Sequence, residues 1–171
     1  MRKLMPWLAP VVLSAPVLLG VSGCQHAPIL AETAAGGERL HQVTKVPFRM
    51  DGVVAYSCRA PMQPVAPHGD FYCHVFVNEA GLDTMRTGQG PYPVGTVIVK
   101  QKFADDQGTE TELFTVMRKM ADGYDSENGN WEYSTVDRSA KNVLSRGRLE
   151  SCINCHNAYE KTDYVTREYL R

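Results

Sequence analysis

The chain has 171 residues, with 18 Lys and Arg against 19 Asp and Glu, and a formal charge of −1. This nearly neutral balance gives no electrostatic basis for nucleic-acid binding. After the two N-terminal segments described next, about 125 residues remain, enough for one domain with its own core.

Residues 1–23 have the features of a secretory signal peptide. Arg2 and Lys3 precede an apolar stretch that is short and contains three prolines, which argues against a membrane-spanning helix. The stretch ends in "VSGC", which resembles a bacterial lipobox and predicts Cys24 as the lipidated first residue of the mature chain. Gln25 after it resembles lipoproteins sent to the outer membrane, so a periplasm-facing, lipid-anchored protein is predicted. The alternative is ordinary cleavage, with Cys24 left as an odd thiol.

Removal of residues 1–23 leaves 16 basic and 19 acidic side chains, a charge of −3. Residues 24–45 are rich in small side chains and have no sustained apolar period, so a flexible tether is predicted there. The folded domain is then expected over residues 46–171.

Two further cysteines flank a Pro-rich loop. In an oxidising periplasm Cys58 and Cys73 are predicted to form a disulfide, worth about 3 kcal/mol for a loop of this length. The alternative is a pair of buried thiols. Neither interpretation gives these residues a role in chemistry.

The middle of the chain alternates between apolar and polar residues like half-buried β-structure. Asn78 is placed to cap a short helix that ends at Gly88. Strands are predicted over four stretches: 73–78, 94–103, 111–120 and 131–137. The predicted class is α+β, a mainly antiparallel sheet with short helices and a C-terminal helical segment.

That C-terminal segment contains "CINCH", formed by Cys152, Cys155 and His156. At i, i+3 and i+4 the two thiols and the imidazole would share one helix face. C-x-x-C-H is typical of covalent haem c attachment, with the thiols bonded to the porphyrin and the histidine as proximal iron ligand. A zinc site would need a fourth ligand, and a thioredoxin-like dithiol should open a βαβ unit rather than close the chain.

No methionine or histidine follows His156, so any ligand on the other side of the iron must come from upstream. His74 is expected to be a hydrogen-bonded strand residue, and the central methionines are expected to fill the core. The other upstream candidates are His26, His41 and His68, with Met85, Met117 and Met120. The sequence therefore favours a haem whose distal face is open to a small ligand.

Strand alternation sets which side chains share a face with Lys100. Ile98 is expected on the same face as Lys100 in the strand over 94–103. Thr115 and Met117 share a face of the strand over 111–120. Taken alone, a lysine within "TVIVK" would be an edge residue with its amine in solvent.

Three pieces together, "YPVGTVIVKQ", "GYDSENGNWEY" and "CINCH" followed by "KTDYV", resemble the cytochrome P-460 family over residues 72–168. The resemblance implies a mostly antiparallel fold with one haem c, commonly dimeric. It also implies that Lys100 is bonded through its nitrogen to a porphyrin meso carbon. Hydroxylamine-oxidising members place a carboxylate over the iron, where this sequence has Thr115, which cannot accept protons at neutral pH. A small register shift could bring the nearby Glu112 to that place.

Three functions follow from the resemblance and the motif. The first is oxidation of hydroxylamine or a related nitrogen oxide, with Lys100 and Thr115 at the reacting face and a periplasmic protein as electron partner. The second is capture of nitric oxide without turnover, as in the related cytochromes c′-beta. The third is simple electron transfer, which requires an upstream sixth ligand.

Overall fold

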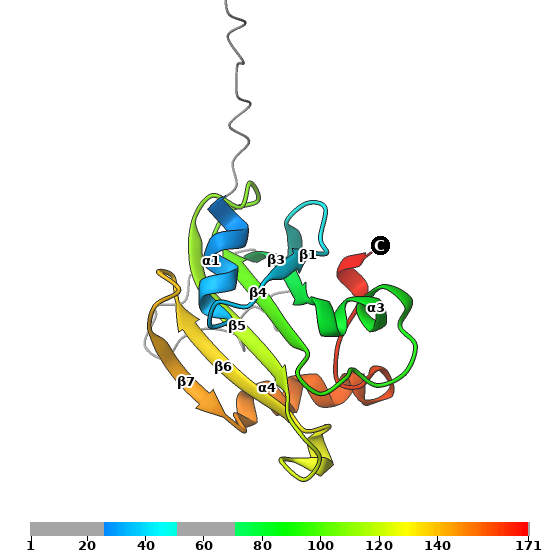
Figure 1. Cartoon of the computed structure of the whole chain (residues 1–171). Coiled ribbons are helices and arrows are strands. Elements are labelled where there is room, and N and C mark those ends of the chain that lie inside the picture. Colours follow the sequence, from blue (N-terminus) through cyan, green and yellow to red (C-terminus); the bar gives the residue numbers. More distant parts are fainter. Residues whose placement is uncertain (1–25, 51–70, 171) are drawn as a thin grey trace, which may run out of the picture.

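The computed structural model describes residues 26–50 and 71–170. Within these residues the chain forms a seven-stranded, entirely antiparallel sheet with short helices (Figure 1). The sheet order is β1-β3-β4-β5-β6-β7, with β2 also paired to β3. The strands are β1 (Leu40–Gln42), β2 (Phe48–Met50), β3 (Phe71–Asn78), β4 (Val97–Phe103), β5 (Thr111–Lys119), β6 (Trp131–Asp137) and β7 (Val143–Gly147). The predicted α+β class is confirmed.

The helical elements are short and lie mostly near the ends of the domain. They are α1 (His26–Ala34), α3 (Glu79–Thr87), α4 (Glu150–His156), and the 3₁₀ turns η1 (Ser126–Asn128), η2 (Asn157–Thr162) and η3 (Glu168–Leu170). In Figure 1, α1 lies on one face of the sheet, and α4 with the C-terminal segment lies on the other.

Each face of the sheet carries its own apolar core. On the α1 side, Ala31 and Ala35 pack with sheet residues such as Phe76 and Val99. On the α4 side, the core includes Val75, Ile98, Met117, Trp131 and Tyr133, and Cys152 and Ile153 of α4 pack against it. The alternation of the central strands thus supplies both cores, because successive side chains point to opposite faces.

All four predicted strands and the predicted helix are present. Asn78 occupies the N-cap of α3, and Gly88 ends this helix with φ 72°, a left-handed conformation that glycine adopts without strain. The Asn78 side chain makes no capping bond. Instead its Nδ2 donates to Glu38 and to the Gly95 carbonyl, and its Oδ1 accepts from Val97 N–H. It joins the start of β4 to the edge of the sheet.

The prediction of a flexible tether over 24–45 is wrong for residues 30–44. Ala31 and Leu40 are buried, β1 pairs with the end of β3, and the Thr44 hydroxyl accepts a hydrogen bond from Val75 N–H. β1 and β2 occupy the same edge of β3, at its two ends. Small residues hid this segment, because alanines bury little area yet fit closely against a sheet.

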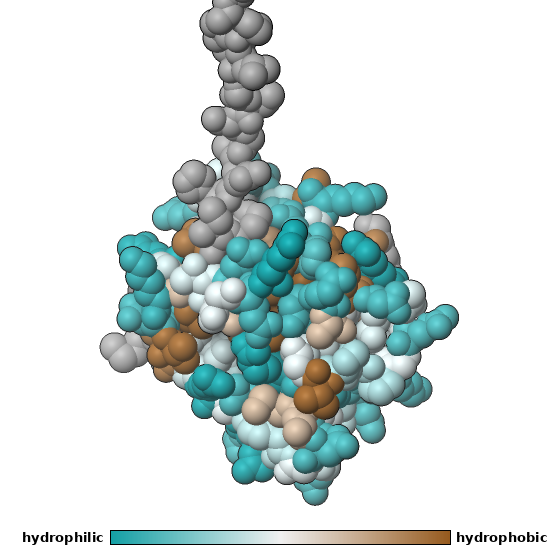
Figure 2. All heavy atoms as spheres, viewed as in Figure 1, coloured by the Kyte–Doolittle hydropathy of each residue, from teal (hydrophilic) through white to brown (hydrophobic). Residues whose placement is uncertain are grey.

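The face shown in Figure 2 is mostly hydrophilic, with hydrophobic residues in small separate patches. Val143 and Leu144 of the edge strand β7 are among the exposed apolar residues. In the described ranges, 26–50 and 71–170, no helix has both the length and the apolar character needed to cross a bilayer.

Candidate functional site

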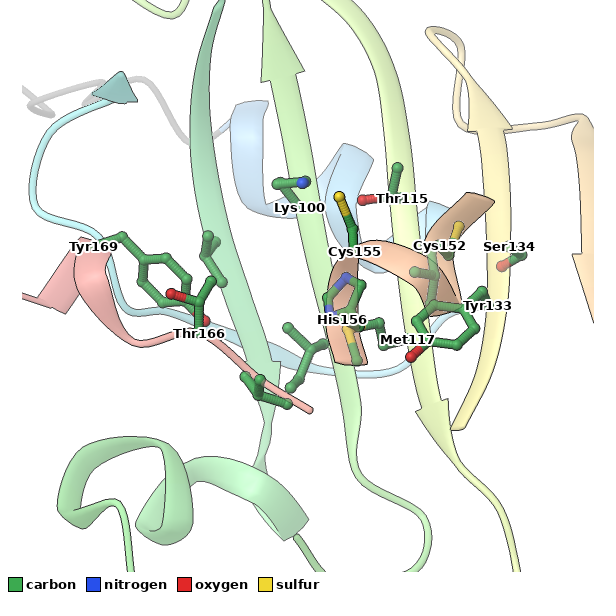
Figure 3. Close-up of a pocket in the computed structure, with 14 residues that line it drawn as sticks. Lys100, Thr115, Met117, Tyr133, Ser134, Cys152, Cys155, His156, Thr166 and Tyr169 are labelled. Atoms are coloured by element: carbon green, nitrogen blue, oxygen red, sulfur yellow. The ribbon is translucent and has the colours of Figure 1, made fainter. Parts of the chain in front are cut away.

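A pocket of about 600 Å³, counting the space at its mouth, lies between α4 and the sheet (Figure 3). Most of its walls are apolar, with a few polar groups and the side chains of the "CINCH" motif. It is lined by Val75, Ile98, Lys100, Thr115, Val116, Met117, Tyr133, Ser134, Cys152, Cys155, His156, Val165, Thr166 and Tyr169.

The helix α4 delivers all three motif side chains to this pocket. It begins after Leu149, whose carbonyl accepts the N–H groups of Cys152 and Ile153, and it ends at His156. Cys152, Cys155 and His156 all line the pocket, as their i, i+3, i+4 spacing predicts. Both cysteines are partly exposed, so their thiols are accessible from the pocket.

His156 is a neutral imidazole with one ring nitrogen already in a hydrogen bond. Its Nδ1 lies 2.7 Å from the backbone oxygen of Tyr164. A carbonyl can only accept, so Nδ1 carries the proton and Nε2 keeps its lone pair. Burial, aided by the charge of Lys100 and opposed by the Tyr164 bond, lowers the pKa of His156 to about 4. This is the state that an axial iron ligand requires.

Lys100 and Thr115 face each other on the opposite wall. They are direct cross-strand partners in the β4–β5 pairing, and both line the pocket. In Figure 3 the nitrogen of Lys100 and the oxygen of Thr115 point toward each other, at the level of the Cys155 sulfur. The predicted faces are therefore correct, and the structure brings the five predicted pocket residues together.

No carboxylate lines the pocket within the described part of the chain. A bulge between Lys102 and Phe103 shifts the β4–β5 register and leaves Glu112 as the extra residue. Glu112 pairs with the buried Lys102 at 3.0 Å, and Lys102 also lies 3.5 Å from the centre of the Phe71 ring. The register shift that would bring Glu112 to the pocket is therefore absent: Thr115 stays opposite Lys100, and Glu112 is bound to Lys102 instead.

Tyr133 is a pocket residue that sequence reasoning missed. It is 2% exposed, and its hydroxyl has no hydrogen-bond partner among the described residues. Its ring lies 5.3 Å from the His156 ring, centre to centre. Burial raises the pKa of Tyr133 well above its usual value, so the group remains a hydrogen-bond donor. Its place in the "NGNWEY" stretch was the available signal.

The upstream candidates for a sixth iron ligand differ in whether they line the pocket. Met117 lines the pocket, whereas Met85 is buried beside the hydroxyls of Tyr92 and Tyr169. His74 is hydrogen-bonded to Thr44 at 2.9 Å and packs against Phe103, as expected of a strand residue.

Other candidates lie away from the pocket or beyond the described residues. His41 is hydrogen-bonded to the exposed Glu79 at 2.8 Å. Cys24, Cys58 and His68 lie outside the described residues, and so do the predicted lipidation and the partner of Cys73. Cys73 itself is fully buried on β3.

The pocket residues fit a haem. Two accessible thiols and a neutral imidazole come from one helix, and the walls are largely apolar. Within residues 26–50 and 71–170, no group of three or more His, Cys, Asp or Glu side chains could hold a metal ion on its own. A zinc site built from the motif therefore lacks the further ligands it needs among these residues.

Comparison with known proteins agrees with this arrangement. A family model described as Cytochrome P460 matches residues 53–167, which is more than half of the chain. The match includes α4, the Lys100–Thr115 pair and Tyr164. No curated protein matches the chain.

Proposed function

Since the chain belongs to the cytochrome P460 family, and is therefore a haem-binding cytochrome, we propose that it carries one covalently attached haem c and binds or oxidises hydroxylamine or a related nitrogen oxide. The observation that carries this proposal is the meeting of Cys152, Cys155 and His156 with the Lys100–Thr115 pair around one pocket.

Within this proposal each side chain has a defined task. The thiols of Cys152 and Cys155 would hold the haem through thioether bonds, and Nε2 of His156 would bind the iron while Nδ1 donates to the Tyr164 carbonyl. The haem supplies the redox-active iron. Lys100 and Thr115 belong to the sheet, opposite α4, where a small ligand would be held. There the Thr115 hydroxyl donates or accepts a hydrogen bond but does not take up a proton at neutral pH.

Oxidation of hydroxylamine to nitric oxide removes three electrons and three protons. We propose a periplasmic electron-transfer protein as the acceptor of the electrons. The protons need a base or water, and the described pocket lining holds no carboxylate. This observation favours a second candidate function, capture of nitric oxide without turnover.

One set of measurements on the protein matured with haem separates these functions. Intact mass should show a covalent haem that is lost in the double variant C152A/C155A, and a further bond to Lys100 should be absent in K100A. Hydroxylamine turnover with an electron acceptor, lost in K100A, supports the enzyme. Nitric oxide binding without turnover supports the binder, and a low-spin six-coordinate spectrum, lost in M117L, supports an electron carrier. A colourless purified chain would overturn the haem c proposal.

The lipid anchor is proposed on the signal sequence and Cys24 alone. Membrane fractions should contain the wild-type chain with a mass increase from the added lipid. In C24A the same haem protein should be recovered from the soluble periplasm, and an unchanged membrane fraction would contradict the anchor.

A further inference from the structure

A strained turn directly after η2 holds the group that orients His156. Asp163 and Tyr164 both have positive φ, 52° and 66°, in the left-handed region. Two consecutive non-glycine residues there are costly and persist only when the surroundings fix them. The turn matters because the Tyr164 carbonyl accepts the Nδ1–H bond of His156 at 2.7 Å.

The Asp163 carboxylate is the main anchor of this turn. Lys119 Nζ donates to both of its oxygens, at 2.6 and 2.7 Å, and Tyr92 N–H donates to one at 2.7 Å. The Asp163 and Lys119 side chains are only 12% and 10% exposed. At that burial a charge-assisted pair is stronger than a surface pair.

The start of β6 and the loop before it provide further anchors. Trp131 Nε1–H donates to the Asp163 carbonyl at 2.9 Å, and the Tyr164 hydroxyl donates to the Glu127 carbonyl at 3.0 Å. Lys119 also lies 5.0 Å from the centre of the Trp131 ring. The three stretches noted in the sequence thus converge on residues 163 and 164, through Tyr92, Trp131 and Asp163 itself.

From this geometry we propose that Asp163 and Lys119 are positioning residues for the axial ligand: their buried ion pair fixes the Tyr164 carbonyl that fixes His156. The proposal rests on the proposed role of His156 as iron ligand. An acceptor on Nδ1 makes the imidazole a stronger donor to the metal and stabilises the oxidised iron. Such partners typically change metal affinity by about 10- to 100-fold.

The test uses the haem-loaded protein and three variants. D163N and K119M each break the buried pair, and Y164F removes only the exposed bond to Glu127 while keeping the carbonyl. The iron–histidine stretching band of the reduced protein is measured by resonance Raman spectroscopy, and the reduction potential by titration. We expect D163N and K119M to shift the band to lower frequency and raise the potential, with smaller shifts in the same directions for Y164F.

R146M is the matched control, because it breaks the Arg146–Glu132 pair on β6 and β7 without touching the turn. It should leave band and potential unchanged. If one of D163N and K119M does not fold, the other pair variant decides the matter. Unchanged band and potential in every pair variant that folds overturn the positioning role. A band that survives in H156Q would instead show that the proposed axial ligand is wrong.

Discussion

The ring of Tyr164 lies directly on Gly129, so that a Cβ at position 129 would be 2.5 Å from its Cε2 atom. Real Cβ atoms do not come this close to carbon, and Tyr164 cannot easily move because its hydroxyl is bonded to the Glu127 carbonyl and its own carbonyl to His156. Gly129 also has φ +68°, which a side chain disfavours. Both the conformation of the loop before β6 and the position of the Tyr164 ring therefore require glycine at position 129.

We therefore expect G129A to lower the free energy of unfolding by about 2–4 kcal/mol, the sum of a left-handed backbone penalty and overpacking. G123A is the matched control: Gly123 lies in the same loop with φ +89° but has open space at its Cβ. It should cost only about 1–2 kcal/mol. Urea unfolding of both variants measures the difference, and equal losses would contradict the contact with Tyr164.

His156 predicts a pH dependence for the haem-free chain. Its pKa is about 4 in the folded state and near 6.5 when exposed. Between these values the unfolded chain binds a proton that the folded chain does not, so the free energy of unfolding falls as the pH is lowered from 6.5 to 4. Above pH 6.5 the stabilising contribution of neutral His156 is fully present. The contribution is at most about 3 kcal/mol.

This prediction is checked in the C152A/C155A background, where haem is not attached. Urea midpoints at pH 7 and pH 4.5 should differ more for this chain than for the same chain with H156Q, since glutamine does not titrate. Parallel pH profiles for the two chains would show that another group is responsible.

The hydroxyl of Tyr133 should matter differently in the two forms of the protein. Without haem it is buried and unpaired, so Y133F should raise stability by about 1 kcal/mol in the C152A/C155A chain. With haem bound we expect the hydroxyl to gain a partner, and the same substitution should then destabilise the protein. Y92F is the control, because the Tyr92 hydroxyl already contacts the Met85 sulfur at 3.5 Å and should behave alike in both forms. The measurement is the urea midpoint of each variant and of its parent chain, with and without haem. A change of the same sign for Y133F in both forms would contradict a partner supplied by haem binding.

The central sheet was predictable because its strands carry their own pattern. β3 to β6 alternate over seven to nine residues with β-branched and aromatic side chains, enough to identify each strand and its faces. The opposition of Lys100 and Thr115 needs in addition the register of two strands. The family resemblance assigned Thr115 to the pocket, and the structure supplies the direct pairing.

What the sequence could not indicate depends on contacts between distant segments. β1 and β2 have three residues each and form only because the edge of β3 is there to pair with them. Asp163 and Tyr164 have no intrinsic preference for the left-handed conformation that is strong enough to predict this turn from the sequence. The turn is fixed instead by Lys119, 44 residues earlier in the chain. The bulge that leaves Glu112 beside Lys102 is a one-residue change that alternation alone cannot locate.

The last prediction concerns the missing carboxylate. Thr115 is directly opposite Lys100 and lines the pocket, so a glutamate there would place a proton acceptor on the wall opposite α4. If proton removal limits turnover, T115E should raise the rate of hydroxylamine oxidation by about 10²-fold or more, the lower range for a positioned base. T115Q has nearly the same size without the base and should stay at the wild-type rate.

The pH profile distinguishes this base from a merely polar effect. The rate of T115E should rise with pH as the new carboxylate loses its proton, whereas the T115Q profile should follow that of the wild type. Equal rates for T115E and T115Q, in proteins that carry the same amount of haem, would mean that proton acceptance at this position does not control the chemistry. In that case the lack of a carboxylate among the described pocket residues would no longer favour a pure nitric oxide binder.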